Sequence, residues 1–257
     1  MKKQYFSPTN DPLVNLETDE NYEIDKEALF NNSAPRLPVV LLVDCSGSMG
    51  FKNYSGIVSP IDEVNKGIKG MLNYLQNDYD ASKRVELAVV AFSSETRVVS
   101  DFTPIANKVI PELTAGGKTY MVPAIKLALD MIEERKRELR SHGRSLYRPI
   151  VILLTDGGPT ESDSVFNEWK KKVYQNTIDK HLQFFAVKIG YESDKELDAK
   201  HAKKLEGFDC KVPAGRLDLS DFSKFFVWLS NSIQTRSKSG NIGDSSIADP
   251  TDWWKKL

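Results

Sequence analysis

The chain has 257 residues, and its 35 Lys and Arg residues nearly balance its 36 Asp and Glu residues, giving a formal net charge of −1. This balance gives no general reason to expect nucleic acid or an anionic membrane as a partner. The sequence also has no apolar run long enough for a membrane span. Two cysteines, Cys45 and Cys210, are too few for a disulfide scaffold, so we expect Cys45 to be a partly buried free thiol.

Composition divides the chain into an arm, a folded domain and a tail. Residues 1–36 are mostly polar and contain three prolines, and we interpret them as an N-terminal arm. Residues 37–236 form the predicted domain, and residues 237–257 form a linker and C-terminal tail. The tail carries Trp253 and Trp254, which either fold back onto the domain or form a docking element for a partner.

The N-terminus carries two lysines, but no apolar segment follows them, so the sequence predicts no secretory signal. We therefore expect a cytoplasmic protein in a reducing compartment.

Strand and helix patterns alternate along the domain. Continuous apolar runs such as 39–43 and 150–154 predict strands buried on both faces, whereas apolar residues at three- and four-residue spacing predict helices. In chain order the predicted elements are strand 39–43, helix 61–75, strand 85–92, strand 96–100, helix 123–140, strand 150–154, helix 165–178, strand 183–189, helix 195–205, a short strand near 210–212, and helix 222–233.

This alternation predicts the fold class. We expect an α/β domain with a doubly wound, mostly parallel sheet flanked by helices, in which 96–100 forms one short antiparallel edge strand. The charged run 133–138 at the end of the long helix alternates in sign, which indicates a solvated helix face.

Polar residues gather where predicted strands end. Asp44, Ser46 and Ser48 follow the first strand, Asp156 follows strand 150–154, and Thr119 lies in a Gly-rich loop before the long helix. In a doubly wound fold the carboxyl ends of the strands meet at one edge of the sheet, where ligands bind. We therefore expect these five side chains to lie close together.

Their chemistry indicates a hard divalent cation. Mg²⁺ prefers oxygen ligands, and these residues offer two carboxylates and three hydroxyls. If hydroxyls occupy inner positions, the ion stays electrophilic and one coordination position is open to an outside carboxylate. The sequence therefore predicts a docking site for Mg²⁺ or Mn²⁺ rather than a closed structural one.

The three loops, in order, resemble the von Willebrand factor A (VWA) domain and its metal-ion-dependent adhesion site (MIDAS). The first loop reads Asp44-Cys45-Ser46-Gly47-Ser48, and Thr119 and Asp156 match the other two ligand positions of the family. The resemblance covers roughly residues 37–234 and implies a Rossmann-like fold. Segments such as 113–117 and 153–157 are similar to the bacterial tellurium-resistance, TerY-like branch, although the stretch 51–59 lengthens the loop after the metal motif.

The resemblance implies a non-enzymatic, intracellular module that binds protein partners through a Glu or Asp on the metal. It also implies a bacterial stress-response setting with kinase- or phosphatase-like partners, and no nucleic acid or membrane partner.

Two alternatives use the same residues differently. The metal site could belong to a Mg²⁺-dependent phosphoryl-transfer or hydrolytic enzyme, or the arm and tail could bind partners around a vestigial site. Residues 117–119 resemble the end of a phosphate-binding loop, but the glycine required five residues earlier is Glu112. The histidines His142, His181 and His201 are predicted to lie on the surface.

Overall fold

The computed structural model describes residues 34–52, 58–190, 195–206, 208, 215–217, 221–242 and 255–256. The predicted arm up to residue 33, the strand expected near 210–212, Cys210 and the Trp253–Trp254 pair lie outside these residues. Within the described ranges, the structure has no helix with the length and apolar character needed to cross a membrane.

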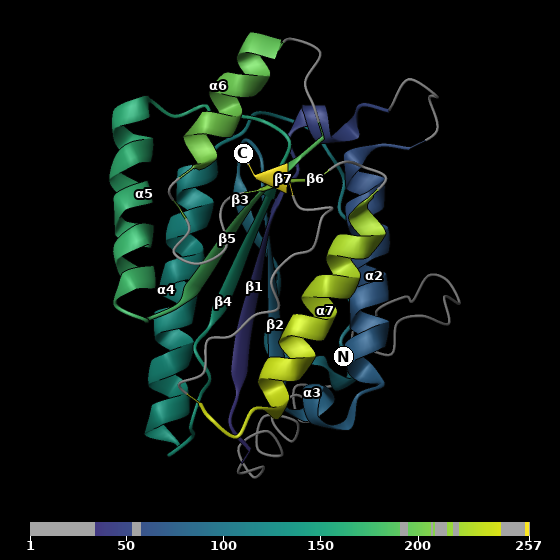
Figure 1. The fold of residues 1–257 in the computed structure, drawn as a ribbon, viewed down its shortest axis with the longest axis vertical. Coiled ribbons are helices and arrows are strands. Elements are labelled where there is room, and N and C mark those ends of the chain that lie inside the picture. Colours follow the sequence, from purple (N-terminus) through teal and green to yellow (C-terminus); the bar gives the residue numbers. More distant parts are fainter. Residues whose placement is uncertain are drawn as a thin grey trace, which may run out of the picture. The chain divides into compact units, whose positions relative to one another are not determined.

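A sheet with strand order β3-β2-β1-β4-β5-β6-β7 forms the centre of the domain (Figure 1). Strands β1, β2, β4, β5 and β6 are parallel, whereas β3 and β7 pair antiparallel at the two edges. The strands are β1 (Leu37–Asp44), β2 (Val85–Phe92), β3 (Thr96–Pro104), β4 (Ile150–Thr155), β5 (Gln183–Ile189), β6 (Gly215–Leu217) and β7 (Lys255–Lys256). The predicted α/β fold class is confirmed.

The strand order reverses at β1. From β1 the chain proceeds outward to β2 and β3, and it then returns to place β4 on the other side of β1. The register pairs Val43 with Leu154, so the ends of β1 and β4 lie next to each other. A reversal of this kind opens a crevice at the carboxyl ends of the strands, and this is where the candidate ligands follow.

Helices cover both faces of the sheet (Figure 1). Val39, Leu41 and Val43 of β1 belong to the core cluster that includes α2 and α7, whereas Val40 and Leu42 belong to the cluster that includes α4 and α5. Because β1 has cores on both faces, every one of its residues is buried. The helices are α2 (Pro60–Gln76), α3 (Tyr79–Arg84), α4 (Met121–Ser141), α5 (Asp163–Ile178), α6 (Lys195–Leu205) and α7 (Phe222–Lys238).

The start of α2 follows directly from its sequence. The Ser59 side chain accepts a hydrogen bond from the Asp62 backbone N–H, and the Asp62 carboxylate accepts one from the Ser59 N–H. Pro60 occupies the first helical position, where its fixed φ favours a helix and its missing N–H costs nothing. This reciprocal cap fixes where α2 begins after the loop that follows the candidate metal motif.

The prediction of a solvated face for 133–138 is wrong in part. Arg135 and Lys136 are only 7% and 5% exposed. Arg135 forms two hydrogen bonds, of 2.7 and 2.8 Å, to the carboxylate of Glu86 in β2, and Arg36 adds a 3.7 Å ion pair to it. One basic residue of this run, Arg135, therefore belongs to a buried ion pair with a distant strand and not to a solvated face. The local sequence pattern gives no sign of that pairing.

Some elements differ from the sequence prediction. Strand β3 extends to Pro104, and α3, β6 and β7 were not predicted. These three are short, and short elements depend on tertiary contacts more than on periodicity. Cys45 is confirmed as a buried free thiol, with 5% exposure.

Candidate metal centre

Backbone hydrogen bonds join the three predicted loops at the carboxyl edge of the sheet. The N–H of Gly47 donates to the Gly117 carbonyl at 3.0 Å, and the N–H of Gly116 donates to the Cys45 carbonyl at 2.7 Å. On the other side, the N–H of Thr160 donates to the Thr119 carbonyl at 2.8 Å. The Gly-rich loop therefore bridges the loops that follow β1 and β4.

Asp44 ends β1 and is completely buried. Its Oδ1 accepts a 2.8 Å hydrogen bond from the Ser46 N–H, and its Oδ2 accepts a 2.6 Å hydrogen bond from the Thr155 hydroxyl. Both carboxylate oxygens are thus oriented by neighbours from two strand ends. Thr155 was not predicted as a site residue, although its position at the end of a buried strand beside Asp156 was a usable signal.

The two serines link Asp44 to Asp156. The hydroxyls of Ser46 and Ser48 are 3.2 Å apart, and the Ser48 hydroxyl donates a 2.8 Å hydrogen bond to Asp156 Oδ1. Four of the five predicted residues therefore lie in one connected group.

Thr119 joins this group through its backbone. Its N–H donates to the Thr160 hydroxyl at 3.2 Å, and its side chain is half-buried. Among the five candidate residues, all of which the structure describes, no hydrogen bond connects the Thr119 hydroxyl to the other four.

The two carboxylates lie in an environment that disfavours negative charge. Burial raises the pKa of Asp44, although hydrogen bonds from Thr155 and Ser46 oppose this shift. Burial and the nearby charge of Asp44 raise the pKa of Asp156 to about 6, against the lowering effects of Ser48 and Lys188. A buried carboxylate and a half-buried carboxylate that repel each other favour a cation between them.

A buried lysine supports the Asp156 loop from beneath. Lys188 in β5 is fully buried, and its ammonium group donates a 2.8 Å hydrogen bond to the Asp156 carbonyl. Sequence reasoning missed this residue because Lys188 lies inside a mostly apolar strand, 32 residues after Asp156, whose carbonyl it contacts.

His201 of α6 packs against the loop that carries Asp156. Its ring occupies the space beside Gly158, where a Cβ would lie only 2.1 Å from the ring. The side chain is half-buried over the Asp156 loop, not fully on the surface. A side chain at residue 158 would therefore require the His201 ring to move.

The residues present fit a hard divalent cation. Carboxylate and hydroxyl oxygens dominate the group, and its members are held by contacts of 2.6 to 3.2 Å. Among the described residues, no group of three or more His, Cys, Asp or Glu could hold a metal ion. A zinc-type cluster is therefore not found in that part of the chain.

Comparison with known proteins agrees with the fold. Residues 39–159 match the family model of the von Willebrand factor type A domain. The chain is 20% identical over 213 residues to inter-alpha-trypsin inhibitor heavy chain H2 of Mesocricetus auratus, and 23% identical over 226 residues to its counterpart in Mus musculus. Each match covers 83% of this chain but 22% of the relative, so the chain spans about a fifth of these relatives' length.

Solved structures with the same fold include two pilus proteins. The pilus adhesin SpaC of Lactobacillus rhamnosus GG has a TM-score of 0.60 at 16% identity, over 79% of this chain and 31% of that one. The vWF domain of the type V pili tip protein Mfa5 of Porphyromonas gingivalis has a TM-score of 0.59 at 12% identity, over 82% of this chain and 99% of that one. Residues 39–159 therefore match the von Willebrand factor type A family model, and the domain that contains them shares its fold with these pilus proteins.

Proposed function

We propose that this VWA domain is a metal-dependent protein-binding module. Asp44, Ser46, Ser48, Thr119 and Asp156 would hold Mg²⁺ or Mn²⁺, and a Glu or Asp of a partner protein would complete the metal's ligands. The supporting observation is the hydrogen-bonded group that runs from Asp44 through the two serines to Asp156. VWA domains commonly mediate protein–protein interactions and typically bind a divalent metal at this kind of site.

The metal would supply an electrophilic centre that attracts a carboxylate. The chain's own residues orient the ligands: Thr155 and the Ser46 N–H fix the two oxygens of Asp44, and Ser48 fixes Asp156. Because the group contains only two carboxylates, a divalent cation there keeps enough positive character to attract an acidic side chain from outside.

The cellular setting is proposed from the sequence alone. Similarity of 113–117 and 153–157 to the TerY-like branch suggests a bacterial stress-response system of the tellurium-resistance type, in the cytoplasm, with kinase- or phosphatase-like partners.

A pull-down from a bacterial lysate tests the proposal. Tagged protein is incubated with Mg²⁺, with EDTA, and as the Asp156→Ala variant with Mg²⁺. We expect partners to be captured only by the first sample. Asp130→Ala, which removes an exposed carboxylate on α4, is the matched control and should capture the same partners as the parent protein.

Capture of the same partners in all samples would contradict the metal-bridged mechanism. A phosphatase and nucleotidase assay with Mg²⁺ or Mn²⁺ addresses the enzymatic alternative directly. Sustained turnover that is lost in Asp44→Ala would favour an enzyme over a binding module.

A further inference from the structure

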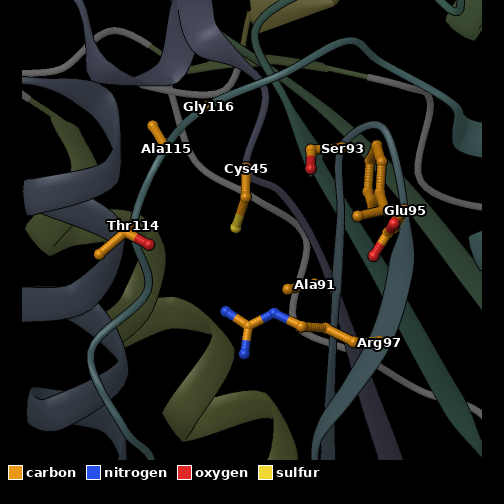
Figure 2. A pocket seen from close by; sticks show the side chains of 9 residues that line it. Cys45, Ala91, Ser93, Glu95, Arg97, Thr114, Ala115 and Gly116 are labelled. Carbon is orange, nitrogen blue, oxygen red and sulfur yellow. The ribbon is translucent and has the colours of Figure 1, made fainter.

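A pocket of about 230 Å³ lies directly beside the candidate metal centre. It is bounded by the loop after β1, by the turn between β2 and β3, and by the Gly-rich loop. Figure 2 shows the side chains of Cys45, Thr114 and Arg97 pointing toward one another across it. One water occupies about 30 Å³, so the pocket has room for a carboxylate group together with several waters.

Two of the loops that line the pocket also carry candidate metal ligands. Cys45 lines the pocket and lies between Asp44 and Ser46, two candidate metal ligands. Gly116, which donates its N–H to the Cys45 carbonyl at 2.7 Å, lies three residues before Thr119. A group bound in the pocket would therefore contact both loops that carry the metal ligands.

Arg97 supplies a positive charge to this pocket. It extends from β3, where it pairs with Ala91 across the sheet, and it is exposed. Among the described residues it has no ion pair and no hydrogen-bond partner. Unpaired guanidinium groups bind carboxylates well, because their N–H donors match the two oxygens in a fork.

The other lining groups limit what can bind. Cys45 contributes a buried free thiol to the wall opposite Arg97. Glu95 also lines the pocket, and its carboxylate disfavours a doubly charged group such as phosphate more than a singly charged one. The lining therefore suits one carboxylate.

We propose that this pocket is a second anion subsite, in which Arg97 binds another acidic side chain of the same partner segment that docks on the metal. The recognised partner would thus present two acidic residues close together in sequence. This inference rests on the proposed function only in that the metal binds the first acidic residue. Arg97 binds the second acidic residue through its own charge, without the metal.

Fluorescence anisotropy with a peptide panel tests this proposal. The probes are fluorophore-labelled, end-blocked alanine peptides with one Glu, or with two Glu residues separated by zero to three positions, in buffer with Mg²⁺. We expect the best two-Glu peptide to bind about three- to ten-fold more tightly than the one-Glu peptide. Arg97→Gln should remove this difference and leave one-Glu binding unchanged, whereas Arg97→Lys should retain part of it.

The matched control is Arg137→Gln, which removes an arginine from the exposed face of α4. It should leave both affinities unchanged. When EDTA weakens one-Glu binding, the subsite is contradicted if Arg97→Gln weakens one-Glu and two-Glu peptides equally or changes neither affinity. It is also contradicted if no peptide binds at millimolar concentration.

Failure of the proposed function gives a different pattern. If the metal does not take part, EDTA and Asp156→Ala will leave the affinity of every peptide unchanged, and Arg97→Gln will weaken one-Glu and two-Glu peptides alike because Arg97 is then their binding site. If the metal takes part but the subsite is wrong, EDTA will weaken all peptides and Arg97→Gln will not discriminate among them.

Discussion

The hydroxyl of Ser48 donates a 2.8 Å hydrogen bond to Asp156 Oδ1, although 108 residues separate the two in the chain. This contact joins the loop after β1 to the loop after β4, which are neighbours because β1 and β4 pair in parallel. Ser48 therefore orients the carboxylate of Asp156, which lies next to it only because the two strands pair.

Ser48→Ala should weaken Mg²⁺ binding by about ten-fold or more, because it removes a candidate ligand and releases Asp156. Calorimetric titration with Mg²⁺ measures this effect. Ser164→Ala, which breaks an exposed serine–serine contact with Ser162 at the start of α5, is the matched control and should bind Mg²⁺ like the parent. Equal Mg²⁺ affinity in Ser48→Ala and the parent would contradict the assignment.

Metal-free protein should lose stability as the pH rises past Asp156's pKa. Folding raises that pKa from 3.8 to about 6, so the folded state binds the proton more tightly than the unfolded state does. The free energy of unfolding should therefore fall between pH 4 and about pH 6, by up to about 3 kcal/mol. Urea unfolding in EDTA measures this change.

Asp156→Asn separates this effect from other titrations. The variant keeps the shape of the side chain but carries no charge, so at pH 7.5 without metal it should be more stable than the parent. Mg²⁺ that binds the folded parent protein should raise its free energy of unfolding, and Asp156→Asn should lose this increase. Reduced stability of the metal-free variant at pH 7.5 would contradict the raised pKa of Asp156.

Gly117→Ala should destabilise the Gly-rich loop. Gly117 has φ of +89°, and a Cβ there would lie 2.7 Å from the Ser94 hydroxyl. Strain and contact together should cost about 1–3 kcal/mol in urea unfolding and weaken Mg²⁺ binding through Thr119. Gly116→Ala is the control, since its Cβ would meet no atom within 4 Å. Equal loss in both variants would indicate a general loop effect instead.

Glu86→Gln should be strongly destabilising. Glu86 is fully buried and pairs with Arg135 and Arg36, so the neutral variant removes the buried carboxylate that these two guanidinium groups share, and the partly exposed Glu138 still pairs with Arg135. Removing one partner of a buried ion pair costs about 3–5 kcal/mol, which urea unfolding measures. Glu112→Gln, in the exposed pair with Lys69, should leave the unfolding midpoint nearly unchanged.

Much of the fold could be predicted from periodicity. The apolar runs at 39–43 and 150–154 indicated buried strands, and both are buried at every position because helices cover the sheet on both sides. The grouping of Asp44, Ser46, Ser48 and Asp156 could also be predicted, because loops that follow parallel strands meet at one edge.

Other features depended on contacts that local patterning does not encode. The run 133–138 looked solvated, yet Arg135 is buried because Glu86 of a distant strand faces it. Likewise, nothing local shows that Lys188 supports the Asp156 loop or that His201 packs on Gly158.

The sequence by itself determined the order of the longer strands and helices, the near-neutral charge and the residue types at each strand end, because these depend on spacing and composition. Only the tertiary structure decided which groups surround the carboxylates of Asp44 and Asp156, and whether those groups favour the charged or the protonated form. Thr155 reaches Asp44, and Arg97 faces Cys45, through strands paired side by side in the sheet. Burial and electrostatic interaction act through space, so their effects appear only once the chain has folded.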